Sequence, residues 1–225
     1  MQRINIALDG PAGAGKSTVA KRMADKLGYI YIDTGAMYRA LTWKALQVQV
    51  DVHDEQQLVA LLNNCEIRLE PGENGQKVYV DDEDVTNPIR EREVTNQVSF
   101  VASHEAVRLE MLRLQRELAK ERGVVMDGRD IGTHVLPTAE IKIFLSASIQ
   151  ERAERRFLEL QQKGEQITLA ELEEEIKKRD EIDSQRKTAP LRKAEDAVEI
   201  DSTGLSIEQV VQQIVTLVQQ KLGGE

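Results

Sequence analysis

The chain has 225 residues, of which 40% are hydrophobic, enough to bury the core of one domain with inserted subdomains. Its formal net charge of −9 argues against broad binding of nucleic acid, although it does not exclude a locally basic pocket for a small anion. Cys65 is the only cysteine, so an intramolecular disulfide is excluded and no cysteine cluster indicates a metal site. The sequence has neither a signal-peptide core nor an apolar run of membrane-spanning length, so we expect a cytoplasmic protein without a membrane partner.

Short apolar runs alternate with helical patterns along the chain. Most of these runs are continuously apolar, which is typical of strands covered on both faces of a parallel sheet. The predicted strands span residues 3–9, 29–33, 124–127, 141–146 and 197–201. The predicted helices span residues 16–27, 36–49, 104–122 and 206–222, the last of them capped by Ser206 with Gln209 three positions on. We therefore predict an α/β fold with a doubly wound, five-stranded parallel sheet.

Two regions interrupt this alternation. In residues 64–88, "CEIRLE" and "KVYVDD" flank the turn sequence "PGENGQ", which predicts a β-hairpin, with a third short strand near Val85. We expect this small antiparallel element to be inserted on the main sheet. Residues 148–193 are rich in charge and predict two helices joined around Gly164, the second capped by Thr168 and Glu171. Pro190 marks the return to the core.

The stretch "GPAGAGKST" fits the phosphate-loop pattern G-x-x-x-x-G-K-[ST] between a predicted strand and a predicted helix. Its glycines let the backbone curl so that several N–H groups face a polyphosphate, and the following helix adds its positive end. In this pattern the lysine reaches the β- and γ-phosphates and the first hydroxyl ligates Mg²⁺. We assign ATP binding to Gly10, Pro11, Ala12, Gly13, Ala14, Gly15, Lys16, Ser17 and Thr18. The alternative is a chance glycine-rich turn. The predicted strand before it and the predicted helix after it argue against that alternative.

A second acidic element belongs with this loop. Asp127 ends the apolar run "VVMD", and a carboxylate at such a strand end often holds Mg²⁺. We therefore expect a magnesium site at Ser17 and Asp127. Asp9, at the end of the first strand, is the rival ligand, and either carboxylate can instead serve as a turn or helix cap.

A phosphate loop alone does not separate GTPases, ATP-driven motors and small kinases, but the guanine-reading sequence N-K-x-D is absent. Four segments occur in order: "DGPAGAGKST", "DTGAMYR" at 33–39, "DGRDIG" at 127–132 and "RDEIDSQR" at 179–186. Together they closely resemble the bacterial cytidylate kinases, over essentially the whole chain. The resemblance implies transfer of the γ-phosphoryl group of ATP to CMP or dCMP, giving ADP and CDP or dCDP.

The resemblance also implies a division of the chain. Residues 1–225 form one kinase domain, with a core made of 1–35, 89–147 and 194–225. Residues 36–88 form the monophosphate-binding region with the hairpin, and residues 148–193 form a lid. We expect this kinase to work as a monomer, with ATP and CMP or dCMP as its small-molecule partners and no nucleic-acid partner.

An acceptor that is itself a phosphate needs cations, and arginine binds phosphate with a bidentate fork. The resemblance assigns Arg39, Arg129 and Arg186 to the CMP phosphate, with a hydrogen bond from Thr34. Any one of these arginines alone is better explained as a surface charge, but three at motif positions favour a site.

For the cytosine base, a carboxylate that receives the amino protons, beside an arginine that donates to the acceptors, discriminates cytosine from uracil. The resemblance places Ser99, Arg108 and Asp130 there, where the alternatives are a surface hydroxyl and a helical ion pair. It leaves the sugar to Asp183 with Arg179 nearby. Because Arg179, Asp183 and Arg186 are spaced i, i+4 and i+7, a helix would place them on one face.

The lid carries Arg152, Arg155 and Arg156, which we expect to close over ATP and exclude water. We count Arg156 with Lys16, Arg129 and Arg186 as catalytic, while which lid arginine contacts ATP is left open. A solvated helix is the alternative, because glutamates interleave with these arginines.

Two other functions are compatible with parts of the pattern. One is a small phosphate-loop kinase that acts on UMP or on a non-nucleotide acceptor. The segments "DGRD" and "RDEIDSQR" argue against this alternative. The other is a nucleotide-dependent switch, which the arginines on the acceptor side disfavour.

Overall fold

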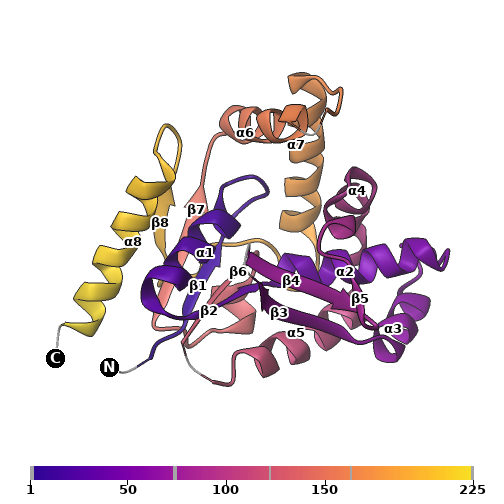
Figure 1. Cartoon of the computed structure of the whole chain (residues 1–225), viewed down its shortest axis with the longest axis horizontal. Helices are drawn as coiled ribbons and strands as arrows, with labels where there is room; N and C mark the ends of the chain where they lie inside the picture. Colours follow the sequence, from indigo (N-terminus) through magenta and orange to yellow (C-terminus); the bar gives the residue numbers. More distant parts are fainter. Residues whose placement is uncertain (1–2, 73–74, 122, 163, 224–225) are drawn as a thin grey trace.

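The computed structural model describes residues 3–72, 75–121, 123–162 and 164–223. Its central layer is a five-stranded parallel sheet with the strand order β2-β6-β1-β7-β8 (Figure 1). The strands are β1 (Ile6–Asp9), β2 (Ile30–Asp33), β6 (Val124–Gly128), β7 (Ile141–Ser146) and β8 (Val198–Asp201). The predicted sheet is therefore confirmed. Strand β1 begins later than predicted because Ile4 N–H and Asn5 N–H donate to the side chains of Tyr29 and Glu140 instead of to a strand.

Helices cover both faces of this sheet. Helices α1 (Lys16–Leu27) and α8 (Ile207–Leu222) pack against Ile6, Leu8 and Val125 on one face. Ala7, Val124 and Met126, the alternate positions, pack on the other face with partly buried Leu112 of α5 (Glu105–Leu118). Both sets of side chains are buried, which accounts for the continuously apolar strands and makes the sheet doubly wound.

Two helices differ from their predicted bounds. Helix α2 (Thr34–Gln47) begins two residues earlier than predicted because the Asp33 side chain accepts a hydrogen bond from Ala36 N–H at 2.8 Å and caps it. Helix α5 ends at Leu118 because the N–H groups of Ala119 and Lys120 bond back three residues and close its last turn. The predicted end of that helix, residue 122, lies outside the described residues.

The sequence did not predict several short helical segments. These are α3 (Glu55–Asn64), η1 (Pro88–Arg90), α4 (Arg92–Val101) and the π-helical turn η2 (Ile131–Val135). No helix of the described ranges is long and apolar enough to cross a membrane.

The inserted hairpin is confirmed as β3 (Ile67–Gly72) and β4 (Gly75–Val80), and β5 (Glu83–Asp84) adds the third strand. It forms a separate antiparallel sheet rather than an extension of the main sheet. The two sheets are joined by a side chain: Gln76 donates to Tyr31 O at 2.7 Å and accepts from Asp33 N–H at 3.1 Å. The predicted turn residues 73 and 74 lie outside the described residues.

Helices α6 (Ile149–Gln162) and α7 (Leu169–Gln185) form the charged hairpin that rises at the top of Figure 1. The predicted capping box of Thr168 and Glu171 is present at the start of α7. This α6–α7 hairpin has its own small core of Ala153, Leu160, Leu172 and Ile176.

Candidate active site

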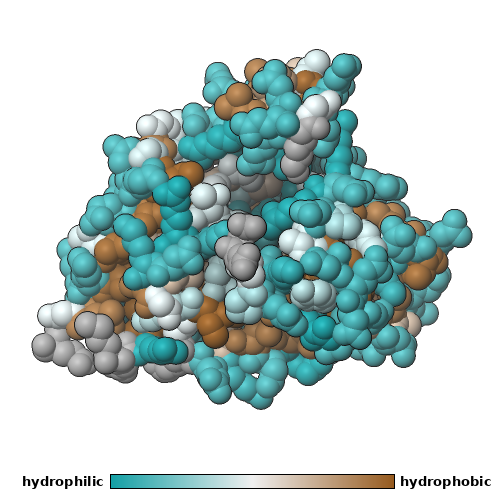
Figure 2. Space-filling model, viewed as in Figure 1, coloured by the Kyte–Doolittle hydropathy of each residue, from teal (hydrophilic) through white to brown (hydrophobic). Residues whose placement is uncertain are grey.

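The candidate site lies where the parallel strands end, which is where open α/β sheets bind ligands. Gly10 follows β1, Thr34 follows β2 and Arg129 follows β6. In Figure 1 the loop after β1 lies below the α6–α7 hairpin. Figure 2 shows that this face is largely hydrophilic and is hollowed beneath the hairpin. The sheet therefore brings motifs far apart in the sequence to one edge.

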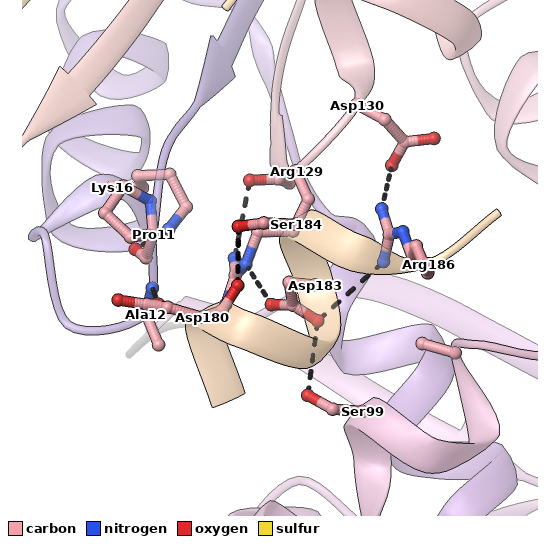
Figure 3. A network of polar contacts seen from close by, with 12 residues as sticks. Pro11, Ala12, Lys16, Ser99, Arg129, Asp130, Asp180, Asp183, Ser184 and Arg186 are labelled. Atoms are coloured by element: carbon pink, nitrogen blue, oxygen red, sulfur yellow. Dashed lines mark hydrogen bonds and ion pairs between the residues drawn. The ribbon is translucent and has the colours of Figure 1, made fainter. Parts of the chain in front are cut away.

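The phosphate loop runs from Gly10 to Gly15, between β1 and α1. Gly15 is the N-cap of α1 with φ of 88°, a left-handed conformation that favours glycine. Because Gly15 has no side chain to cap the helix, the first N–H groups of α1 are suited to bind an anion. Lys16 lies buried beside the loop, and its Nζ donates to Pro11 O at 2.7 Å (Figure 3). Burial, with nearby Arg129, lowers the pKa of Lys16.

The predicted metal pair is brought together. Ser17 Oγ donates to Asp127 Oδ2 at 3.0 Å, and Tyr31 Oη donates to Asp127 Oδ1 at 2.9 Å. Burial, which outweighs these bonds, raises the pKa of Asp127 to about 6. A hydroxyl and a carboxylate are oxygen donors of the kind Mg²⁺ prefers, and Mg²⁺ usually takes few protein ligands alongside water and substrate phosphates. The residues present therefore fit a magnesium ion bound together with phosphate.

Asp9 has a different arrangement. Both of its oxygens accept backbone hydrogen bonds, from Ile131 N–H at 2.8 Å and Gly132 N–H at 2.7 Å. It thereby anchors the π-helical turn that follows Asp130. This geometry favours Asp127 over Asp9 as the carboxylate beside Ser17.

Cations gather beside the phosphate loop. Arg179 Nε is buried and has no hydrogen-bond partner among the described residues. Burial, followed by the positive charges of Arg129, Arg39 and Arg156, lowers the pKa of Arg179 to about 10. A site that binds an anion requires such a group of neighbouring positive charges, with a hydrogen-bond donor still free to reach the anion.

Acidic side chains hold the predicted arginines in place. Arg39 donates to Asp33 at 2.8 Å, and Arg129 Nε donates to Asp183 at 2.9 Å. The carboxylate of Asp183 also accepts from Ser99 Oγ at 3.2 Å (Figure 3). Ser99 is therefore placed with the predicted sugar residue, whereas the sequence grouped it with the base readers.

The two predicted base readers form a buried pair. Arg108 Nη2 donates to Asp130 Oδ2 at 2.5 Å, and Arg186 Nη2 lies 3.4 Å from the other carboxylate oxygen of Asp130. Arg108 also lies over the ring of Tyr38, 5.5 Å from its centroid. Thr34, predicted to bond the CMP phosphate, donates from its hydroxyl to Asp127 O at 2.7 Å.

The three lid arginines have separate environments. Arg152 is buried against the phosphate loop and Asp180, and Arg155 donates to Ser202. Arg152 and Arg155 are thus both engaged in hydrogen bonds near the base of the α6–α7 hairpin. Arg156 pairs with Glu159 at 3.1 Å and is one of the cations that act on Arg179.

Sequence reasoning missed Asp33, Gln76 and Asp180. Asp33 opens the motif "DTGAMYR", where an aspartate before a helix is a recognisable N-cap. Asp180 stands inside "RDEIDSQR", yet its partner Ala12 is 168 positions away in the sequence. Nothing in the pattern around Gln76 signals its contact with β2.

The family model described as "Cytidylate kinase" matches residues 6–220. The chain belongs to the cytidylate kinase family. It is 60% identical over 222 residues to "Cytidylate kinase" of Geobacillus kaustophilus (strain HTA426), with 99% of each chain covered. It is 59% identical over 223 residues to "Cytidylate kinase" of Anoxybacillus flavithermus (strain DSM 21510 / WK1), again with 99% of each covered.

Among solved structures, this cytidylate kinase family member is similar to an uncharacterized protein from Eubacterium ventriosum ATCC 27560. The TM-score is 0.54 at 14% identity, with 97% of this chain and 99% of the other covered. That likeness supports the fold alone. The resemblance read from the four motifs is confirmed by the family match.

Proposed function

We propose residue roles for the reaction of this family, in which the γ-phosphoryl group of ATP is moved to CMP or dCMP. The observation that carries the assignment is Arg179, whose buried Nε has no partner among the described residues and which lies among other cations beside Lys16. Such a cluster serves to bring two phosphates together, because phosphoryl transfer depends on positioning and on neutralising charge.

On the donor side, residues Gly10 to Thr18 hold the ATP phosphates with backbone N–H groups, and Lys16 supplies a buried positive charge. Ser17 and Asp127 hold Mg²⁺. The ion, when bound, neutralises charge on the phosphate oxygens. Burial lowers the pKa of Lys16, and a bound polyphosphate would offset this effect by favouring the charged form.

On the acceptor side, Arg39, Arg129 and Arg186 bind the CMP phosphate, and the carboxylates of Asp33 and Asp183 keep two of these guanidiniums oriented. Thr34 is also assigned to the CMP phosphate, and its hydroxyl is held near the end of β6 by its bond to Asp127 O. The attacking group is a phosphate oxygen, which is already a nucleophile, so no general base is assigned.

Asp130 reads the cytosine amino group, and Arg108 donates to the base acceptors. Asp183 binds the sugar, with Arg179 nearby, and Ser99 supports Asp183. Arg156 is the lid arginine we assign to the transferring phosphoryl group, because its charge acts on Arg179, whereas Arg152 and Arg155 bond to the phosphate loop and to Ser202. We further propose that the enzyme is cytoplasmic and monomeric and binds neither nucleic acid nor membrane.

The test is an ADP-release assay with ATP, Mg²⁺ and each of CMP, dCMP, UMP, AMP and GMP. We expect CMP or dCMP to give the highest kcat/KM. Fastest turnover of a purine monophosphate would contradict the base assignment. Slow hydrolysis of ATP that no monophosphate accelerates would favour a nucleotide-dependent switch instead.

A further inference from the structure

Both backbone polar groups of Ala12, in the phosphate loop, bond to side chains of the α6–α7 hairpin. Ala12 N–H donates to Asp180 Oδ1 at 3.3 Å, as Figure 3 shows. Arg152 Nη1 donates to Ala12 O at 2.9 Å and to Asp180 Oδ2 at 2.6 Å. A loop residue, a residue of α6 and a residue of α7 therefore form one closed ring of hydrogen bonds.

This ring is largely shielded from water. The Arg152 side chain is 4% exposed and that of Asp180 is 20% exposed. Arg152 Nε also donates to Ala147 O at 3.0 Å, which fixes the guanidinium at the start of α6. A Cβ built on Gly13 would lie 3.2 Å from Arg152 Cβ, so the arginine stem packs directly on the loop backbone. Charge-assisted hydrogen bonds in such a shielded place are strong and hold their geometry.

Side chains rather than a regular backbone ladder hold the loop: Lys16 Nζ, for example, donates to Pro11 O at 2.7 Å. Glycine is conformationally permissive, and the backbone bond from Ala14 N–H to Pro11 O is long, at 3.5 Å. Further along the loop, Ala14 O accepts a hydrogen bond from Ser202 Oγ at 3.4 Å, and Ser202 Oγ in turn accepts one from Arg155. An anion cradle works best when its donors are already oriented before the ligand arrives.

Helix α7 carries two carboxylates that contact different parts of the candidate site. Asp180 of α7 faces the phosphate loop, and Asp183, three residues later, faces Arg129 and Ser99 (Figure 3). The two carboxylates are separated by less than one helical turn, yet they contact different motifs.

We propose that Arg152 and Asp180 are positioning residues that act as a unit to hold the phosphate loop in its ATP-binding shape. The inference rests on the proposed role of the loop in binding the ATP phosphates. It replaces the expectation that Arg152 closes over ATP with a role that acts through the loop backbone.

The experiment compares Asp180→Ala, Arg152→Ala and the double variant in steady-state assays that vary ATP and CMP separately. We expect the KM for ATP to rise about tenfold or more in each single variant, because a charge-assisted bond is lost, while the KM for CMP changes less than about twofold. The double variant should be no worse than the more affected single variant, as for two residues of one unit. Asp183→Ala provides the contrast on the same helix: there the KM for CMP should rise and the KM for ATP should not.

Two further variants keep the test decisive. Glu181→Gln removes an exposed negative charge next to Asp180 and should leave both KM values unchanged. Asp180→Asn keeps an oxygen for Ala12 N–H but loses the anionic partner of Arg152, so it should show the ATP effect even where the alanine variant does not fold.

Equal rises in the two KM values, a loss confined to kcat, or additive effects in the double variant would overturn the inference. Lys16→Ala separates it from the proposed function. If Lys16→Ala impairs the reaction and Asp180→Asn leaves the KM for ATP unchanged, only the inference fails. If neither variant has an effect, the assignment of the loop to ATP fails as well.

Discussion

Arg129 and Asp183 are joined by a hydrogen bond of 2.9 Å from Nε to Oδ2, and Nη1 of the same guanidinium donates to Gly128 O at 3.4 Å. Asp183 is buried, and the pKa of its carboxyl is nevertheless lowered: burial raises it, but Arg129, Arg179 and Arg186 together outweigh that effect. The pair therefore holds a permanently charged guanidinium in a fixed position at the end of β6.

Arg129→Lys tests this guanidinium, because lysine keeps the charge but presents a single donor group instead of a planar fork. We expect kcat/KM for CMP to fall about tenfold to one-hundredfold, equivalent to roughly 1.4–2.7 kcal/mol, while the KM for ATP changes little. Steady-state kinetics with each substrate varied in turn provides the measurement. An unchanged kcat/KM for CMP would remove Arg129 from the acceptor site.

Lys16→Ala removes the buried cation of the phosphate loop. Losing a preorganised charge in such a site costs about 3–4 kcal/mol of transition-state stabilisation, so kcat should fall about one-hundredfold to one-thousandfold. Single-turnover assays with saturating ATP and CMP measure this directly. Lys26→Ala, an exposed lysine of the same helix, is the matched control and should retain activity.

The parts of this molecule that the sequence predicts are those whose cause is local. Apolar runs predict the parallel strands, and the capping boxes of Thr168 with Glu171 and Ser206 with Gln209 predict where α7 and α8 begin. Helix α4 escaped prediction because three of its four buried positions are valines, which are β-branched, have low helix propensity and are common in strands.

The contacts that complete the site join residues far apart in the sequence. Asp33 meets Gln76, 43 positions away, and Asp180 meets Ala12 across 168 positions. Short motifs could therefore mark Lys16, Arg129 and Asp183 as candidate site residues, but only the packing of the sheets and helices determines which partner each of them takes.

Asp130→Asn tests reading of the base. An amide in place of the carboxylate has one acceptor oxygen and presents N–H donors, so it should repel the cytosine amino group and tolerate the uracil oxygen. We expect the ratio of kcat/KM for CMP to that for UMP to fall at least about tenfold. A preserved ratio would show that Asp130 serves only to hold Arg108 and Arg186.

Asp127→Asn tests the magnesium assignment. A neutral amide binds Mg²⁺ more weakly than a carboxylate, so the concentration of Mg²⁺ for half-maximal activity should rise severalfold at fixed ATP. High Mg²⁺ should restore much of the lost rate. Titrating Mg²⁺ for the wild type and the variant measures the shift. Coincident curves would contradict Asp127 as the magnesium ligand and favour Asp9, the rival carboxylate.

The ligand-free protein should lose stability as pH rises, through Asp9. Burial outweighs the two backbone hydrogen bonds and raises the pKa of Asp9 from 3.8 to about 7. Between these values the native state keeps a proton that the unfolded chain has released, so the free energy of unfolding decreases with increasing pH by up to about 4 kcal/mol across this window. Urea unfolding of the wild type and of Asp9→Asn at several pH values between 4 and 8 isolates this contribution, because asparagine does not titrate. The difference in unfolding free energy between the two proteins should shift in favour of the variant as pH rises, and a difference independent of pH would show that Asp9 is ionised throughout.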